Sequence, residues 1–412
     1  MRQKEEEMTT LAAEKPKRKP GFGMVLTQAS AAHAVSHFHI MTVPVLIPFL
    51  PDRFGLSFVE IGLSITVFSL VSLVVHIPIG FMTDRFGARP MLIAGLLLGS
   101  LSFASLSWFH TYGWLLAAMA AAGLANGVYH PAGYSLIAGH VDGSKVGRAF
   151  SIFTFVGFLG TAVAPGILYW IVVAAGIEFA FLASGVLGAA VALFLSFGPG
   201  AVTDCAERAP RGHGPSPSLK AARSVFNPAV GLMTVLFLLL SLSNVGIHNF
   251  SVTAFTMGYD LDIGTGNWAL TGFLFASAFG VLAGGILADR TARHGYIASG
   301  ALFITALLTA LLAGTSFPGA VICAIMVVAG FLFGIIAPSR DMLVRAAAPI
   351  NAEGRVFAIV STGFNAGGVV GPILFGALLD NNQPHLVFVL VTILILFAVA
   401  LSFGQEFLRR VN

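Results

Sequence analysis

Long apolar stretches recur along the chain, and they limit what it can fold into more than any other feature. Many run for about 20 residues with few charges, the length that an α-helix needs to cross ~30 Å of hydrocarbon. Of the 412 residues, 57% are hydrophobic and only 10% are charged, whereas a soluble domain carries about 25% charge. The chain is therefore predicted to be an all-α protein embedded in a membrane.

The stretches predict twelve transmembrane helices. Their ranges are 23–50, 57–82, 90–108, 113–137, 147–173, 178–198, 228–256, 266–288, 296–315, 318–339, 355–379 and 384–404. A polar segment rich in Gly, Pro and Ser follows the sixth helix and is typical of a flexible linker. We expect five parts: a cytoplasmic N-terminal tail at 1–22, a six-helix bundle at 23–198, a cytoplasmic linker at 199–227, a second six-helix bundle at 228–404 and a cytoplasmic C-terminal tail at 405–412.

The basic residues indicate how the helices are oriented. With both termini placed in the cytoplasm, every one of the 22 Lys and Arg residues except Arg53 falls on the cytoplasmic side. An excess of Lys and Arg on the cytoplasmic face is the general rule for inner-membrane proteins. The net charge of +4 thus follows from topology, and no nucleic-acid partner is expected. The predicted location is the cell inner membrane, crossed many times.

The chain repeats itself at half its own length. The stretch "GLANGVYHPAGYSLIAGHVDGSKVGRAFSIFTFVGFLGTAVAP" (123–165) aligns without a gap with "GFLFGIIAPSRDMLVRAAAPINAEGRVFAIVSTGFNAGGVVGP" (330–372), and 11 of the 43 positions are identical. Each copy covers one helix, a loop and the next helix. The two halves are therefore predicted to be homologous bundles around a central site, as in many secondary transporters.

A second duplicated motif points to a family. "GFMTDRFGARP" (80–90) joins the second and third helices, and "GILADRTARH" (285–294) joins the eighth and ninth. Each places an Asp–Arg pair four and five residues after a Gly. Two copies at symmetric positions closely resemble the loop signature of the major facilitator superfamily. The resemblance implies twelve transmembrane helices in two pseudo-symmetric six-helix bundles, and secondary transport by alternating access.

The same resemblance implies a cytoplasmic gate that latches the halves when the outer side is open. The implied cross-pairs are Asp84 with Arg355 and Asp289 with Arg148, and Arg85 and Arg290 adjoin the two acids. The alternative is that these charges only follow topology and contact lipid headgroups.

The first half also resembles the fosmidomycin-resistance exporters. The similarity lies in "SHF", "FGLSFVEIGLSITVF" and "YHPAGYSLIA", and it implies export of a small organic compound. Two departures count against drug–proton antiport. The stretch "AAAGLANGVYHP" of the fourth helix has no Arg, and the Gly–Pro motif of the fifth helix is only partial in "GFLGTAVAPG".

Polar side chains deep in the predicted spans are the candidates for binding solute or protons, because burying them in a bilayer is costly. They are His33, His37, Asn126, Tyr129, His130, Asn244, His248, Arg340 and Asn365. Histidine changes charge near neutral pH, so His37 and His130 are expected to bind the coupling proton or to donate hydrogen bonds to the solute. The alternative for any single histidine is a neutral side chain that bonds a neighbouring helix.

Three other functions stay open. Arg340 favours uptake of an organic anion. His33, His37, His39 and Met41 could bind a transition metal for transport. A sensor or scaffold without flux is the alternative from another class. An enzyme is not expected, since no nucleophile–base motif or cofactor signature is present, and neither a cofactor nor a resident metal is predicted. The expected partners are a small-molecule substrate, protons and the lipid bilayer, with the chain acting as a monomer.

Overall fold

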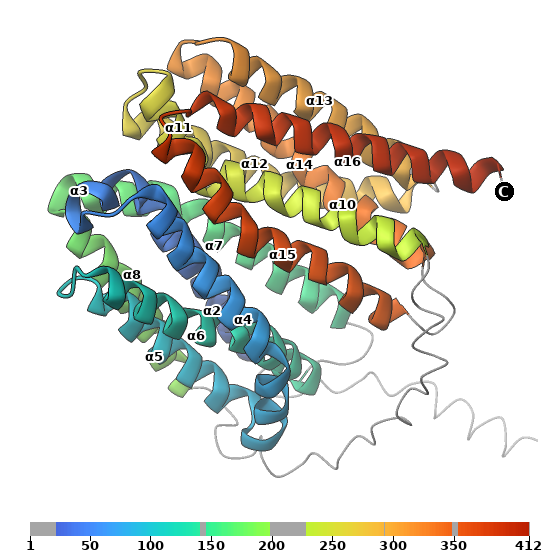
Figure 1. Ribbon diagram of the computed structural model, residues 1–412. Helices are drawn as coiled ribbons and strands as arrows, with labels where there is room; N and C mark the ends of the chain where they lie inside the picture. Colours follow the sequence, from blue (N-terminus) through green and yellow to red (C-terminus); the bar gives the residue numbers. More distant parts are fainter. Residues whose placement is uncertain (1–21, 141–145, 198–227, 292, 348–352, 412) are drawn as a thin grey trace, which may run out of the picture.

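The computed structural model describes residues 22–140, 146–197, 228–291, 293–347 and 353–411. The predicted linker at 199–227 and nearly all of the N-terminal tail lie outside these residues. Figure 1 shows the helices in two groups, one from each half of the chain. The prediction of an all-helical membrane protein is confirmed.

The first group contains six long helices and a short extension of the first one. The bounds are α2 Phe22–Leu46, followed by η1 Ile47–Phe49 and α3 Leu50–Phe54, then α4 Phe58–Phe86, α5 Ala88–Ser105, α6 Tyr112–His140, α7 Val146–Ala175 and α8 Ile177–Ser196. Within the group, α2 packs on α7 and α6, while α5 packs on α6 and α8.

The second group repeats this arrangement. Its bounds are α10 Pro228–Val245, continued by a π-helical turn η3 Gly246–Phe250 and α11 Ser251–Gly258, then α12 Ile263–Asp289, α13 His294–Gly314, α14 Gly319–Ala347, α15 Glu353–Asp380 and α16 His385–Val411. The last helix continues through residues expected to form the C-terminal tail.

Eleven spans among the described residues are long and apolar enough to cross a membrane. The remaining long helix, α6, has 29 residues and packs between α4 and α5. Its glycines and its polar residues Asn126 and His130 lower its hydropathy. A twelve-helix arrangement is thus consistent with the structure.

Local signals set several helix ends. Ser57 and Glu60 form a capping box at the start of α4, which satisfies backbone donors that the helix leaves unpaired. Asp262 caps α12 in the same way and accepts a hydrogen bond from the Thr265 amide. Hydrogen bonds from the Thr265 hydroxyl and amide hold the pKa of Asp262 below its ordinary value, because they stabilise the carboxylate.

The repeated glycines lie where helices touch through their backbones. A Cβ on Gly160 would collide with the carbonyl oxygen of Ala34, and a Cβ on its repeat partner Gly367 would lie 2.6 Å from Cβ of Ser241. Ala34 and Ser241 are separated by the same 207 positions as the glycines. The repeat in the sequence therefore corresponds to the same helix–helix contact in each half of the chain. At this contact, only glycine lets the two helices approach closely.

The two groups meet at one end of the molecule, which we call the closed end and define by residues 58–69 of α4 and 368–380 of α15. The Asp380 carboxylate accepts hydrogen bonds from the backbone amides of Phe58 (2.7 Å) and Val59 (2.9 Å). The Thr66 hydroxyl donates to the Val369 carbonyl at 2.7 Å. Figure 1 shows the groups diverging from this end toward the end at which α16 finishes.

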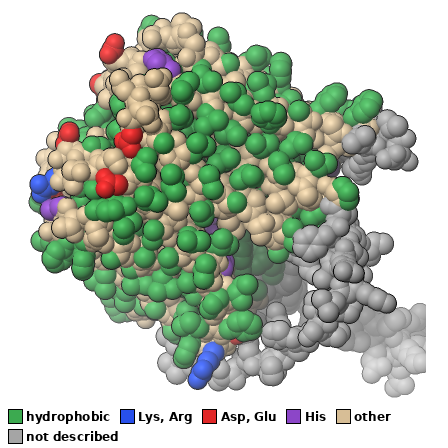
Figure 2. Space-filling model, in the orientation of Figure 1, with side chains coloured by type: hydrophobic (Ala, Val, Ile, Leu, Met, Phe, Trp, Pro, Cys, Tyr) green, Lys and Arg blue, Asp and Glu red, His purple; other side chains and the backbone are tan. Residues whose placement is uncertain are grey.

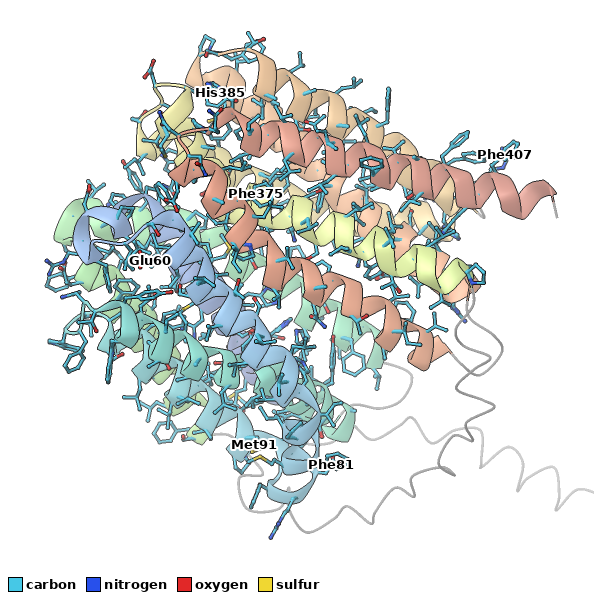
Figure 3. All side chains as sticks on the ribbon, in the orientation of Figure 1. Glu60, Phe81, Met91, Phe375, His385 and Phe407 are labelled. Carbon is cyan, nitrogen blue, oxygen red and sulfur yellow. The ribbon has the colours of Figure 1, made fainter. Side chains whose placement is uncertain are left out.

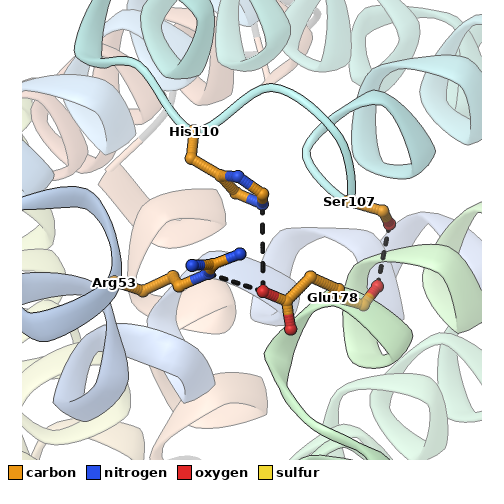
Figure 4. Close-up of polar contacts among 4 residues, drawn as sticks. All are labelled: Arg53, Ser107, His110 and Glu178. Atoms are coloured by element: carbon orange, nitrogen blue, oxygen red, sulfur yellow. Dashed lines mark hydrogen bonds and ion pairs between the residues drawn. The ribbon is translucent and has the colours of Figure 1, made fainter.

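Arg53 is the one basic residue that the orientation places outside, and the structure pairs it with an acid. Its Nε lies 2.5 Å from Oε1 of Glu178, and Nε2 of His110 lies 4.0 Å from the same oxygen (Figure 4). The Ser107 hydroxyl donates to the Glu178 backbone carbonyl at 2.8 Å. The cluster joins α3, α8 and the turn before α6. Both charged side chains are partly exposed, so the pair stabilises the fold only slightly.

The orientation can be checked by cysteine labelling. In a chain with Cys205 and Cys323 replaced by Ser, we expect a membrane-impermeant maleimide to react with Asp52→Cys and Asn382→Cys in intact cells. Arg293→Cys should react only after permeabilisation, because the excess of basic residues predicts that its end of the bundle faces the cytoplasm. All three positions are exposed, so a negative result reports topology and not burial. The reverse pattern would contradict the orientation.

Candidate functional site

Three of the predicted polar residues come together in the first group of helices. His33 and His37 lie one turn apart on α2, and His130 reaches them from α6. The ring centroid of His33 lies 4.6 Å from that of His37 and 5.0 Å from that of His130. One ring nitrogen from each histidine lies within 4.8 Å of the other two. We call these three residues the histidine cluster.

His33 is held rigidly in the cluster. Its ring stacks on Phe153 of α7, with centroids 3.9 Å apart and planes 1° from parallel, and its Nδ1 lies 2.8 Å from the Phe153 carbonyl oxygen. A carbonyl oxygen only accepts hydrogen bonds, so Nδ1 carries the proton and donates it. The other nitrogen, Nε2, is buried and has no hydrogen-bond partner among the described residues.

His37 is oriented by a hydroxyl. Its Nδ1 lies 2.8 Å from Oγ1 of Thr161 on α7. Gly157, one turn before Thr161, gives the two rings room, because a Cβ there would lie 2.5 Å from the His33 ring. His37 and His130 are half-buried, so part of the cluster is accessible to solvent.

His39 and Met41 do not belong to this cluster, so the set of metal ligands considered for the first helix was wrong in these two members. The Nε2 of His39 lies 2.9 Å from the Ser184 carbonyl oxygen on α8, and its ring contacts Phe103. Met41 is buried in the hydrophobic core. For His39 the reason is helical geometry, since it lies about 200° around the helix from His37.

The other predicted residues of α6 lie beside the cluster without joining it. The Asn126 amide donates to the Ser72 hydroxyl at 2.8 Å, which ties α6 to α4. Tyr129 is buried, and its hydroxyl has no partner among the described residues. His76 of α4 stacks on His130 with centroids 6.5 Å apart, so a row of histidines extends from the cluster to α4.

The second group contributes a helix defect. Residues Gly246–Phe250 form a π-helical turn between α10 and α11, and this turn packs near α2 across the boundary between the groups. His248 lies in the turn, half-buried, with its ring 5.7 Å from that of Phe273. The carbonyl oxygen of the Asn244 side chain is buried without a partner in the described chain. Asn365 of α15 is half-buried. Single π-turns inside α-helices are frequent at functional sites.

Arg340 is placed by an acid and an aromatic ring. Its guanidinium lies 2.9 Å from Oδ1 of Asp341 and 4.3 Å from the ring centroid of Phe237 on α10. Both contacts stabilise the positive charge of the guanidinium. The sequence offered no signal for Phe237, because nothing in the spacing shows which helix faces α14 at this depth.

The predicted gate residues lie at the end where the groups diverge. Asp84, Arg85, Arg148, Asp289 and Arg290 are all exposed. Asp289 and Arg148 form no ion pair in this arrangement of the described residues, and the side chain of Arg355 lies outside them. The halves are apart at this end, so the expected cross-pairs, which belong to the opposite state, stay a prediction.

The surface agrees with this placement of charge. Figure 2 shows a broad hydrophobic surface with charged side chains near the two ends, and histidine atoms visible between the two groups of helices beside a hollow. Figure 3 shows Glu60 and His385 toward the closed end, and Phe81 and Phe407 toward the other end.

The sequence did not indicate the roles of three residues, namely Thr161, Phe153 and Asp380. Each forms a hydrogen bond with a partner more than 100 positions away in the sequence.

Comparison with known proteins gives a consistent result. The family model described as "Major Facilitator Superfamily" matches residues 29–265 and 234–407, together most of the chain. The chain is 25% identical over 309 residues to the fosmidomycin resistance protein of Escherichia coli K12, covering 73% of each. It is 26% identical over 408 residues to the multi-drug resistance efflux pump PmrA of Streptococcus pneumoniae, covering 93% of this chain and 94% of that one.

A solved structure shares the fold. The crystal structure of a bacterial homolog of the human lysosomal transporter Spinster, inward-facing and occupied, superposes with a TM-score of 0.76 at 15% identity. The superposition covers 95% of this chain and 98% of the other.

Proposed function

We propose that this chain, which belongs to the Major Facilitator Superfamily, exports a small organic solute across the inner membrane by alternating access. The observation that carries the proposal is the arrangement of the two halves. They are joined by polar contacts at the closed end and apart at the other end, and polar side chains of α2 and η3 lie near the boundary between them. A transporter of this type exposes such a boundary to one side at a time.

Export is favoured over uptake by the relatives. Two of the similar proteins are a resistance protein and an efflux pump. In this chain, the histidine cluster, Asn126 and Tyr129 are proposed to contact the solute from the first half. Asn244, His248 and Asn365 are proposed to do so from the second.

A proton gradient is proposed to drive the transport. His248 is the proposed carrier, because it is half-buried near the boundary, and no hydrogen bond holds its ring among the described residues. A histidine side chain can take up a proton and release it again. The protein is proposed to act as a monomer with both termini in the cytoplasm.

Uptake of an organic anion is the second candidate. It is favoured by Arg340, whose side chain is 20% exposed and whose guanidinium lies over the ring of Phe237. In this alternative, the anion would displace the Asp341 carboxylate from the guanidinium.

The cytoplasmic latch is proposed for the opposite state of the cycle. There, Asp84 would pair with Arg355 and Asp289 with Arg148, while Arg85 and Arg290 lie alongside. Exposed pairs stabilise by about 0–1 kcal/mol each, which is enough to bias an equilibrium between two states. An outward-facing structure in which Asp84 and Arg355 are far apart would contradict this pairing.

The proposed function can be tested in liposomes containing the purified chain. We expect flux of at least one cationic or neutral antibiotic or one organic anion to accelerate when a pH gradient is imposed, and to slow when a protonophore collapses it. A thermal-shift screen selects the solutes, since a ligand at a hundredfold its dissociation constant stabilises by about 2.7 kcal/mol. His248→Gln should retain binding and lose the dependence on the gradient. Flux that ignores the gradient in the unmodified protein would contradict proton coupling, and inward-driven accumulation of anions would favour the second candidate.

A further inference from the structure

The histidine cluster has the composition of a metal site. Three imidazoles converge from two helices, with one ring nitrogen of each within 4.8 Å of the others. The ring of His33 meets both other rings edge-on, at interplanar angles of 86° and 70°. A packed aromatic core alone does not require three nitrogens to meet at one point.

The Nε2 atom of His33 carries a lone pair that accepts no hydrogen bond from the described residues. Because Nδ1 donates its proton to the Phe153 carbonyl oxygen, the neutral ring has its lone pair on Nε2. The side chain is only 2% exposed, and Nε2 has no partner in the described structure. An unpaired buried polar atom in a folded protein calls for an explanation, and a bound water or ion is one of those known.

His37 also has one ring nitrogen engaged by α7. Its Nδ1 lies 2.8 Å from Oγ1 of Thr161, and when this hydroxyl accepts the Nδ1 proton, the lone pair of the ring is on Nε2. Metal-binding histidines nearly always have the second ring nitrogen hydrogen-bonded to a carbonyl, a carboxylate or water, which orients the ring. Phe153 and Thr161, both on α7, supply such partners to the two histidines of α2.

We propose that His33, His37 and His130 bind a divalent transition-metal ion of the Zn²⁺ type. Imidazole nitrogen suits Zn²⁺, Co²⁺, Ni²⁺ and Cu²⁺, whereas Mg²⁺ and Ca²⁺ require oxygen ligands. Tetrahedral Zn²⁺ with Zn–N distances of about 2.05 Å places its nitrogens ~3.4 Å apart. The rings must therefore move together by roughly 1 Å from their present separation, which side-chain rotation of the half-buried His37 and His130 supplies.

Three protein ligands leave one coordination position open, as in zinc sites that bind water or a substrate atom. Because His37 and His130 are half-buried, the open position is on the accessible side of the cluster. The site does not depend on the proposed solute or on proton coupling, and it can be tested without a transport assay.

The test is a Co²⁺ and Zn²⁺ titration of the full chain, purified in detergent with a tag that contains no histidine. We expect one Co²⁺ per chain, with the strong visible absorption of a low-coordinate site, displaced by one Zn²⁺ and unaffected by a large excess of Mg²⁺. His33→Gln, His37→Gln and His130→Gln should each weaken binding at least tenfold. Thr161→Val leaves all three ligands in place and should weaken it about 10- to 100-fold through the lost orientation of His37.

His140→Gln is the matched control, since His140 lies on the same helix as His130 but outside the cluster. It should bind Co²⁺ as the unmodified chain does. Size-exclusion profiles identify any variant that fails to fold, and Thr161→Val then decides the case. The proposal is overturned if the unmodified chain binds no stoichiometric Co²⁺. It is also overturned if Thr161→Val, or the variant that combines His33→Gln, His37→Gln and His130→Gln, binds Co²⁺ with unchanged affinity.

Discussion

A disulfide between residues 69 and 368 is expected to stop transport completely and reversibly. Cβ of Ser69 on α4 lies 3.9 Å from the Cβ position of Gly368 on α15, within the 3.5–4.5 Å that a disulfide requires. The bond would join the halves across the closed end. If transport needs this end to open, the oxidised Ser69→Cys/Gly368→Cys variant should lose flux by at least about tenfold.

The measurement compares liposome flux before oxidation, after oxidation and after reduction, in a chain with Cys205 and Cys323 replaced by Ser. The single variants Ser69→Cys and Gly368→Cys control for the substitutions and should respond to neither reagent. Reduction should restore flux in the double variant. A cross-linked protein that transports at the original rate would show that α4 and α15 do not separate, and alternating access through the closed end would be wrong.

Replacing a glycine of the repeat by alanine, the smallest possible substitution, should lower the free energy of unfolding strongly. A Cβ on Gly330 of α14 would collide with the carbonyl oxygen of Phe273 on α12. Because the obstacle is backbone, the helices must separate, and Gly330→Ala is expected to destabilise by more than the 1–3 kcal/mol of ordinary overpacking. Total stabilities are only about 5–15 kcal/mol, so we expect a large fall in the thermal unfolding temperature.

Gly300 of α13 is the matched control. It lies inside a helix, it is exposed, and nothing lies within 4 Å of its Cβ position. Alanine is a better helix former than glycine by up to about 1 kcal/mol, so Gly300→Ala should be neutral or stabilising. Unfolding is followed by intrinsic fluorescence in detergent for both variants. Equal unfolding temperatures for Gly330→Ala and the unmodified chain would contradict the close helix contact.

The secondary structure and the pairing of halves could be predicted from the sequence because both follow from local chemistry. Apolar runs of membrane length must be helices, since lipid offers backbone groups no partners. A gapless repeat at an offset of 207 residues implies two similar bundles, and the contacts of Gly160 and Gly367 with residues the same distance apart agree with it. Arg340 beside Asp341 is likewise a local pair that neighbouring positions reveal.

The site was only partly predictable. The spacing of His33 and His37 shows that they share a face of one helix, and it also separates them from His39. It does not show that His130 of α6 meets them, or that Phe153 and Thr161 orient their rings.

The sequence by itself determined that the chain is helical, crosses the membrane, consists of two similar halves and has histidines within its apolar helices. Only the tertiary structure decided which histidines converge and where the halves touch. Asp380 illustrates the reason: its carboxylate caps α4 from more than 300 positions away. Periodicity reports which face of a helix a residue occupies, whereas the choice of partner for that face depends on how all the helices pack together.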